Sequence, residues 1–225
     1  MVVDPRAIAN RHEDQKVRAV GALTVGVTEQ PWALASTDLA AWRAGGLSDA
    51  EVLHAILQAA LFGHFTRIAD ATGVASDYPD RFCVPNPAPG SPRYLRPSKR
   101  PPRGAALDTA MHAGVVDQLA KWAAHAQERD DHFDRRRRAL IRKTVSDLLG
   151  DRVETDATPR DELDHALVEL TETVTLAPWD LCGAAYARVR AAGLADDTAV
   201  FDVVATASSC GVLSRIAVTL AALAR

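Results

Sequence analysis

The segment Val27-Thr28-Glu29-Gln30-Pro31-Trp32-Ala33-Leu34 indicates an internal duplication, because a similar segment recurs 147 positions later as Val174-Thr175-Leu176-Ala177-Pro178-Trp179-Asp180-Leu181. Eight nearby residues also have the same residue type at the same offset: Leu23, Thr24, Ala40, Arg43, Ala44, Gly46, Leu47 and Asp49. One residue is inserted in the second copy, and six more then recur at an offset of 148: Val52, Ala59, Gly63, Arg67, Ile68 and Ala69. Such self-similarity indicates a supersecondary unit that needs its twin to bury an apolar face. We therefore expect two copies related by a pseudo-twofold axis.

Composition predicts an all-α fold for this duplicated chain. Of 225 residues, 48% are hydrophobic and only 5% aromatic, and alanine and leucine are abundant, which favours helix over sheet. We expect a single all-α domain over 1–225. The first repeat covers about 6–76, a proline-rich connection and two intervening helices cover 77–154, and the second repeat covers about 155–225.

Each repeat should contain three helices. In the first copy we expect helices over 6–23 and 37–44, and a long helix after Ser48, whose side chain would form a capping box with Glu51. In the second copy we expect Thr158 as the N-cap with Pro159 at the first helical position, a short helix ending at Gly193, and a long helix from Asp197 to the C-terminus. Prolines crowd into 85–102, which therefore predicts an extended connection, followed by helices over 105–129 and 131–149.

Charge and cysteine content exclude several classes of protein. The formal net charge of −3 gives no general attraction to nucleic acid or to an anionic membrane. The three cysteines are not closely spaced, which fits a reducing cytoplasm without disulfides, and we see no signal peptide. The apolar C-terminal stretch carries Asp202 and Arg215 and does not suggest a membrane span. Because apolar helix faces beyond one core seek symmetric partners, we expect a homo-oligomer.

The long helix of the first copy carries two polar side chains on its apolar stripe. Leu53, Ile56, Leu57, Ala60, His64, Arg67, Ile68 and Ala71 share one face at helical spacing. The second copy keeps the arginine as Arg215 but has Val212 in place of His64. A repeated buried arginine is explained by capping carbonyls or pairing with a carboxylate. A histidine found in one copy alone is either a satisfied core residue or a proton-transfer group in a pocket.

The repeated unit resembles the C-terminal helices of the alkylhydroperoxidase D-like and carboxymuconolactone decarboxylase-like superfamily, most of all its peroxidase-related branch. The matching residues are Leu170-Thr171, Pro178, Leu181, Arg190 to Leu194, Asp196 and Arg215-Ile216-Ala217, with Asp38, Arg43 to Asp49 and Phe65 to Asp70 in the first copy. The resemblance implies an all-helical oligomer with active sites near subunit interfaces. It also implies a Cys-x-x-Cys thiol peroxidase, but this chain contains no Cys-x-x-Cys, so no thiol peroxidase is expected.

These observations predict a cofactor-independent enzyme that acts by acid–base chemistry on a small, largely apolar substrate, as a decarboxylase, lyase, isomerase or cyclase. His64 would move a proton, and Arg67 would hold a carboxylate or enolate. Phe65, Asp70, Tyr78 and Arg215 would contact the substrate, without metal or cofactor. The alternative is a non-catalytic oligomer that binds a ligand or partner through the same cavity.

Two further patterns have simpler explanations. Glu51-x-x-His54 and Glu162-x-x-His165 have the spacing used by di-iron carboxylate bundles, which gives a third hypothesis, but capping and first-turn preference also explain the glutamates. The run Arg135-Arg136-Arg137-Arg138, with Arg142 and Lys143, follows a cluster of acidic residues. It predicts a solvated helix with salt bridges and not a nucleic-acid site.

Overall fold

The computed structural model describes residues 14–74 and 113–223, and within them it contains eight α-helices and no strand. The first repeat supplies α2 (Gln15–Glu29), the 3-10 turn η1 (Pro31–Ala33), α3 (Ser36–Ala44) and α4 (Asp49–Thr72). The intervening helices are α5 (Ala113–Glu128) and α6 (Arg135–Leu149). The second repeat supplies α7 (Glu162–Leu176), η4 (Pro178–Asp180), α8 (Gly183–Ala191) and α9 (Asp197–Leu223). The predicted all-α class is confirmed.

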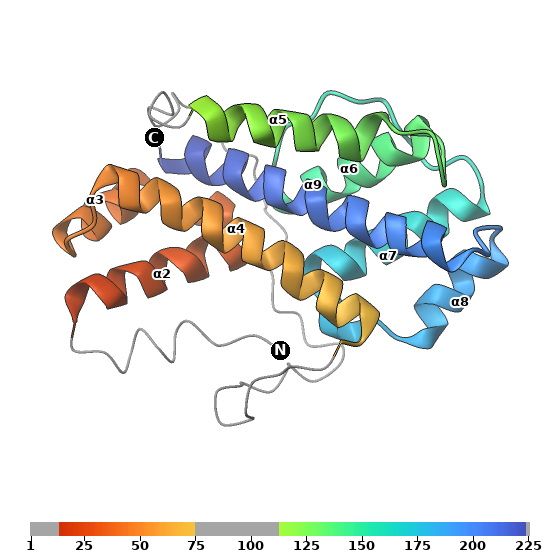
Figure 1. Cartoon of the computed structure of the whole chain (residues 1–225), viewed down its shortest axis with the longest axis horizontal. Coiled ribbons are helices and arrows are strands. Elements are labelled where there is room, and N and C mark those ends of the chain that lie inside the picture. The colour runs from red at the N-terminus through yellow and green to blue at the C-terminus, as the bar shows by residue number, and fades with distance from the viewer. Residues whose placement is uncertain (1–13, 75–112, 224–225) are drawn as a thin grey trace.

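Helix α9 is the centre of the fold. It lies between α5 and α4 in Figure 1, and it also contacts α2, α6 and α7. Its residues join both core clusters: Val203 and Ala207 pack with α6, α7 and α8, while Val212 and Ile216 pack with α2, α3 and α4. Helices α4 and α9 are long and apolar enough to cross a membrane by length and composition. However, 78% of the apolar window of α9 is buried in the protein, against 33% for α4. Its place in the core therefore accounts for the composition of α9.

The secondary structure of the two copies follows the sequence repeat closely. The bounds of α2, η1 and α3 shifted by 147 are those of α7, η4 and α8, and α4 begins 148 positions before α9. Both prolines of the repeated Pro-Trp pair start a 3-10 turn, which ends the preceding helix. The three helices expected in each copy are therefore present.

Local capping agrees with one prediction and corrects others. The Ser48 Oγ accepts the Glu51 N–H at 3.3 Å and Glu51 accepts the Ser48 N–H at 2.9 Å, so the capping box is confirmed. The start at Thr158 and Pro159 is wrong: α7 begins at Glu162, since the Asp161 carboxylate accepts the Asp164 N–H at 2.8 Å.

Two other expected bounds also move. The first helix does not stop at residue 23 but continues to Glu29, since no proline interrupts it before Pro31. Helix α6 begins four residues later than expected, because the Asp134 carboxylate caps it by accepting the Arg137 N–H. The proline-rich segment 85–102 lies outside the described residues.

Candidate functional site

A cavity of about 520 Å³ lies between α5, α9 and the loop that follows α6. This volume is within the range of small-molecule sites. Its walls are mostly small aliphatic side chains from two helices, namely Leu119, Ala120 and Ala123 of α5 and Leu213, Ala217, Val218 and Ala221 of α9. Polar groups join the lining from α5, α6 and the following loop: Gln127, Arg142, Asp151 and Arg152, with Ser214 from α9. The cavity therefore combines an apolar surface with a few polar groups, as ligand sites do.

Arg142 is the main charged group of this lining. Its guanidinium donates to the Gln127 Oε1, and it makes no ion pair with any described residue. Its neighbour Lys143 differs, because Lys143 pairs with Asp147 at 2.5 Å one turn along the helix. A guanidinium carries five N–H donors, so the bond to Gln127 leaves most of them for other acceptors.

Gln127 is held in one orientation by Arg142. Because a guanidinium only donates, the amide oxygen of Gln127 must face it, and the Nε2 group lies on the other side of the amide. The Nε2 is buried and has no hydrogen-bond partner among the described residues. A buried donor without an acceptor costs about 1–3 kcal/mol, so a ligand that accepts from it would recover stability.

Two other polar groups of the cavity, Asp151 and Ser214, are already hydrogen-bonded to each other. Asp151 accepts the Ser214 hydroxyl at 2.8 Å with one carboxylate oxygen and the Arg152 N–H at 2.8 Å with the other. Cys210 also lines the cavity but is only 1% exposed, and burial raises the pKa of its thiol to about 12. The Cys210 sulfur is therefore a neutral thiol at physiological pH and not a nucleophile.

His64 lies on another part of the bundle, on α4. Its ring is half-buried and packs edge-on against Trp122 and Phe65, with ring centroids 5.3 and 5.5 Å away. Burial lowers the pKa of His64, and the nearby Arg67 charge lowers it further, so the imidazole is neutral near pH 7. Its Nδ1 is buried without a hydrogen-bond partner in the described residues. Neither His64 nor Arg67 lines the cavity described above.

Arg67 and Arg215 bind backbone carbonyls across the two copies. Arg67 donates to the Gly63 carbonyl at 2.7 Å and to the Thr175 carbonyl at 3.2 Å, at the end of α7. Arg215 donates to Gly211 at 3.3 Å and to the Thr28 carbonyl at 3.2 Å, at the end of α2. Each arginine thus caps the helix end of the other copy, which agrees with the capping interpretation of a repeated buried arginine.

Three of the other expected substrate contacts, Phe65, Asp70 and Arg215, also do not line that cavity. Phe65 touches the His64 ring but is 56% exposed, and Asp70 is half-buried on the same helix. Arg215 lies with Arg67 at the Thr175 carbonyl, 3.5 Å from its oxygen. Tyr78 lies outside the described residues. Helix α4 itself follows the expected stripe, since Leu53, Ile56, Ala60 and Arg67 are buried. In the second copy Phe201, the counterpart of Leu53 at the repeat offset, is 45% exposed.

The arginine run of α6 is less solvated than expected, because α6 packs against α7 and α9. Arg138 is fully buried and donates to Asp131 at 2.7 Å, to Asp202 at 2.5 Å and to the Thr206 hydroxyl at 2.9 Å. Arg136 and Arg137 both donate to the fully buried Asp164 of α7. The arginine run therefore links α6 to α7 and α9. Sequence spacing alone could not show that its partners are acidic residues far along the chain.

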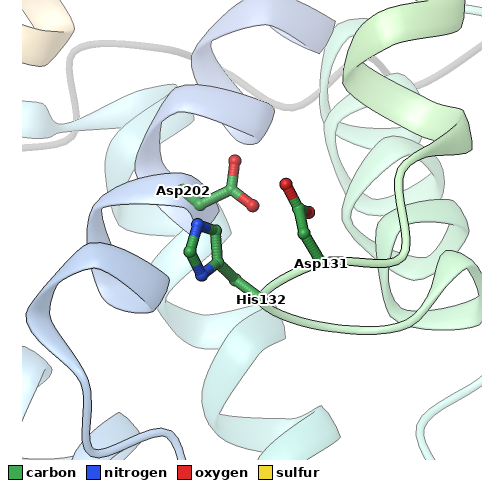
Figure 2. A group of neighbouring side chains, drawn as sticks. All are labelled: Asp131, His132 and Asp202. Atoms are coloured by element: carbon green, nitrogen blue, oxygen red, sulfur yellow. The ribbon is translucent and has the colours of Figure 1, made fainter.

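The carboxylates beside Arg138 also form the only group of metal-ligand type found among the described residues. Ligand atoms of Asp131, His132 and Asp202 lie within 4.8 Å of one another, with Asp202 on α9 and the other two on the loop before α6 (Figure 2). Both carboxylates are already paired with Arg138 and Arg129. Two guanidinium groups supply the positive charge that a cation would bring, so this group is a structural ion cluster.

The two Glu-x-x-His pairs do not converge on a site. Glu51, His54, Glu162 and His165 are all exposed, whereas di-iron bundles direct such pairs inward. Glu51 is also engaged by Lys16 at 2.6 Å, which with the Ser48 hydrogen bonds lowers the pKa of its carboxyl to about 2. These residues fit the capping explanation.

Comparison with family models, with curated proteins and with solved structures found no match to this chain. The cavity was missed by sequence reasoning, which concentrated on the duplicated segments. One signal was present: Arg142 has no acidic residue three or four positions away on its helix, unlike Lys143.

Proposed function

We propose that this chain is a small-molecule-binding protein whose ligand occupies the cavity between α5, α6 and α9. One observation carries the proposal: a cavity of about 520 Å³ joins an apolar wall to an arginine that has no ion pair among the described residues. This proposal keeps the ligand-binding alternative that the sequence suggested but moves the site, because neither His64 nor Arg67 lines this cavity. The site is built by the intervening helices and the second copy, so the first copy serves chiefly as the structural partner of α9.

A neutral fluorescent probe tests the proposal independently of ligand charge. N-phenyl-1-naphthylamine brightens in apolar surroundings, and we expect saturable binding of one probe per chain. Ala217 lines the cavity and its side chain is exposed there, so Ala217→Trp should fill the space and abolish binding. Ala187, an exposed alanine of α8 away from the cavity, provides the matched control Ala187→Trp. Absent binding, or equal binding by both variants, would overturn the proposal.

The second candidate is a cofactor-independent acid–base enzyme centred on His64. The observation that favours it is a buried Nδ1 without a hydrogen-bond partner in the described residues, on an imidazole whose pKa is lowered by burial. Such a group accepts a proton near neutral pH. Arg67 supports this candidate less, because its donors point to the Gly63 and Thr175 carbonyls. Given a candidate substrate, His64→Gln should abolish turnover and leave the melting temperature near wild type. Unchanged turnover would remove the candidate.

We also propose that the copies are related by a pseudo-twofold axis and that the chain is a homo-oligomer. The reciprocal capping by Arg67 and Arg215 supports the axis. The exposed Phe62 and Phe65 of α4 support the oligomer, because their counterparts at the repeat offset, Cys210 and Leu213, face the cavity beneath α5. A second chain would cover the exposed pair. Light scattering that finds only the 24.1 kDa monomer at micromolar concentration would contradict the oligomer.

A further inference from the structure

We propose that the ligand of the α5–α6–α9 cavity is an apolar monocarboxylate, bound through its carboxylate by Arg142 and Gln127. This inference rests on the proposed function, since it specifies what the same cavity holds. It depends on three observations: the charge of the lining, the donors at its polar end and the nature of its walls.

The charge of the lining favours a monoanion. Its charged side chains are Arg142, Arg152 and Asp151, which leave one net positive charge. The Asp151 carboxylate oxygens already accept from the Ser214 hydroxyl and the Arg152 N–H. Arg142 has no ion pair among the described residues, so one negative charge would balance it. The lining offers no further net positive charge that would balance a phosphate dianion.

The available hydrogen-bonding groups at the polar end are donors. Arg142 keeps several N–H groups after its bond to Gln127, and the buried Nε2 of Gln127 lacks an acceptor among the described residues. A planar guanidinium matches the two oxygens of a carboxylate, and charge-assisted bonds of this kind are about twice as strong as neutral ones. An amine or an alcohol head group would satisfy these donors less well.

The walls fit an alkyl chain or a flat ring. Leu119, Ala123, Leu213 and Val218 have no polar side-chain atom, and Cys210 adds a neutral thiol whose pKa is raised to about 12 by burial. A flexible apolar body can therefore lie along α5 and α9 while its carboxylate reaches α6. The Cys210 thiol adds no charge that would compete with Arg142.

Octanoate, 1-octanol and octylamine share an eight-carbon chain and differ in head group, so their affinities report what the head group contributes. Each is titrated against the bound neutral probe on the full-length protein. We expect octanoate to bind about tenfold or more tightly than 1-octanol, and octylamine to bind least. Arg142→Gln should weaken octanoate by about tenfold to a hundredfold and leave 1-octanol nearly unchanged. Lys143→Gln removes an equal charge from the next position, outside the lining, and should change neither affinity more than about twofold.

Gln127→Met removes the second proposed donor, the Gln127 Nε2, with little change in side-chain shape. It keeps the inference testable if Arg142→Gln fails to fold. It should weaken octanoate and spare 1-octanol. Equal binding of octanoate and 1-octanol, with no effect of either variant, would overturn the carboxylate inference while leaving the cavity function intact. Failure of all three ligands and of the neutral probe would overturn both. Loss of octanoate binding in Lys143→Gln as large as in Arg142→Gln would show general charge attraction and would also overturn the inference.

Discussion

Replacing Asp164 with asparagine should destabilise the protein by about 3–5 kcal/mol, the usual cost of breaking a buried ion pair. Asp164 is fully buried, and its carboxylate accepts four hydrogen bonds: two from Arg136 at 2.6 and 2.7 Å, one from Arg137 at 2.9 Å and one from the Arg160 N–H at 2.9 Å. The amide of asparagine presents one oxygen and turns an NH2 group towards donors. At least two of these bonds are lost, at about 1.5–3 kcal/mol each.

Urea denaturation of the full chain measures this loss in the free energy of unfolding. In thermal unfolding, the melting temperature should fall by about 6–20 °C. Asp49→Asn is the matched control, because the Asp49–Arg43 ion pair at 2.6 Å has both side chains about half exposed. Its effect should be far smaller. A loss below about 1 kcal/mol for Asp164→Asn would place this pair with ordinary surface ion pairs and refute the argument.

The same carboxylate predicts a direction of pH dependence. Burial alone would raise the pKa of Asp164, but the bonds from Arg136, Arg160 and Arg137 outweigh it and hold the pKa well below its ordinary value. Because the pKa of Asp164 is lower in the folded protein than in the unfolded chain, where it is near 3.9, ionisation of Asp164 stabilises the folded protein above about pH 4. This stabilisation is lost as the pH falls towards the pKa of the folded state. The difference in the free energy of unfolding between wild type and Asp164→Asn should therefore be constant near neutral pH and become smaller below about pH 4. A difference that grew in acid would contradict this sign.

Three further predictions concern other parts of the molecule. Gly63→Ala should destabilise the protein by about 1–3 kcal/mol despite the better helix propensity of alanine, because its Cβ would lie 2.9 Å from the Arg67 Nη1 and this buried guanidinium cannot move aside without losing its hydrogen bonds to the Gly63 and Thr175 carbonyls. Gly114→Ala, which meets nothing within 4 Å, is the control, and a stabilised Gly63→Ala would contradict this prediction. The His64 imidazole should titrate below 6.5 in an NMR pH series, since burial opposes its charge; a midpoint above 6.5 would refute the burial argument. In a Cys83→Ser background, a thiol reagent should modify exposed Cys182 quickly and buried Cys210 only after unfolding; fast labelling of both would contradict the Cys210 environment.

The fold was predictable from the sequence where local signals and the repeat agreed. Ser48 with Glu51 fixes the start of α4 through a backbone rule that operates within four residues. The repeated Pro-Trp pair follows the ends of α2 and α7, but the expected end of the first helix at residue 23 did not use this signal. The start of α7 was misassigned because two plausible caps, Thr158 and Asp161, lie three residues apart. The choice depends on Asp164, whose carboxylate holds the Arg160 N–H while α6 supplies arginines from a distant part of the chain.

The site was less predictable than the fold. The repeat pointed to His64 and Arg67 as candidates, because the second copy keeps the arginine but has Val212 in place of His64. A buried arginine that binds carbonyls and one that binds a ligand look alike in sequence, and only the position of Thr175 separates them for Arg67. The cavity depends on how α5 and the loop after α6 pack against α9, which no periodic pattern encodes.

A crystal structure of the full chain with bound octanoate would show where the carboxylate and the alkyl chain bind. Our account predicts the alkyl chain between α5 and α9, along Ala123 and Leu213, with the carboxylate within hydrogen-bond distance of Arg142 and the Gln127 Nε2. Octanoate bound beside His64, with the α5–α6–α9 cavity empty, would contradict the account and favour the acid–base enzyme.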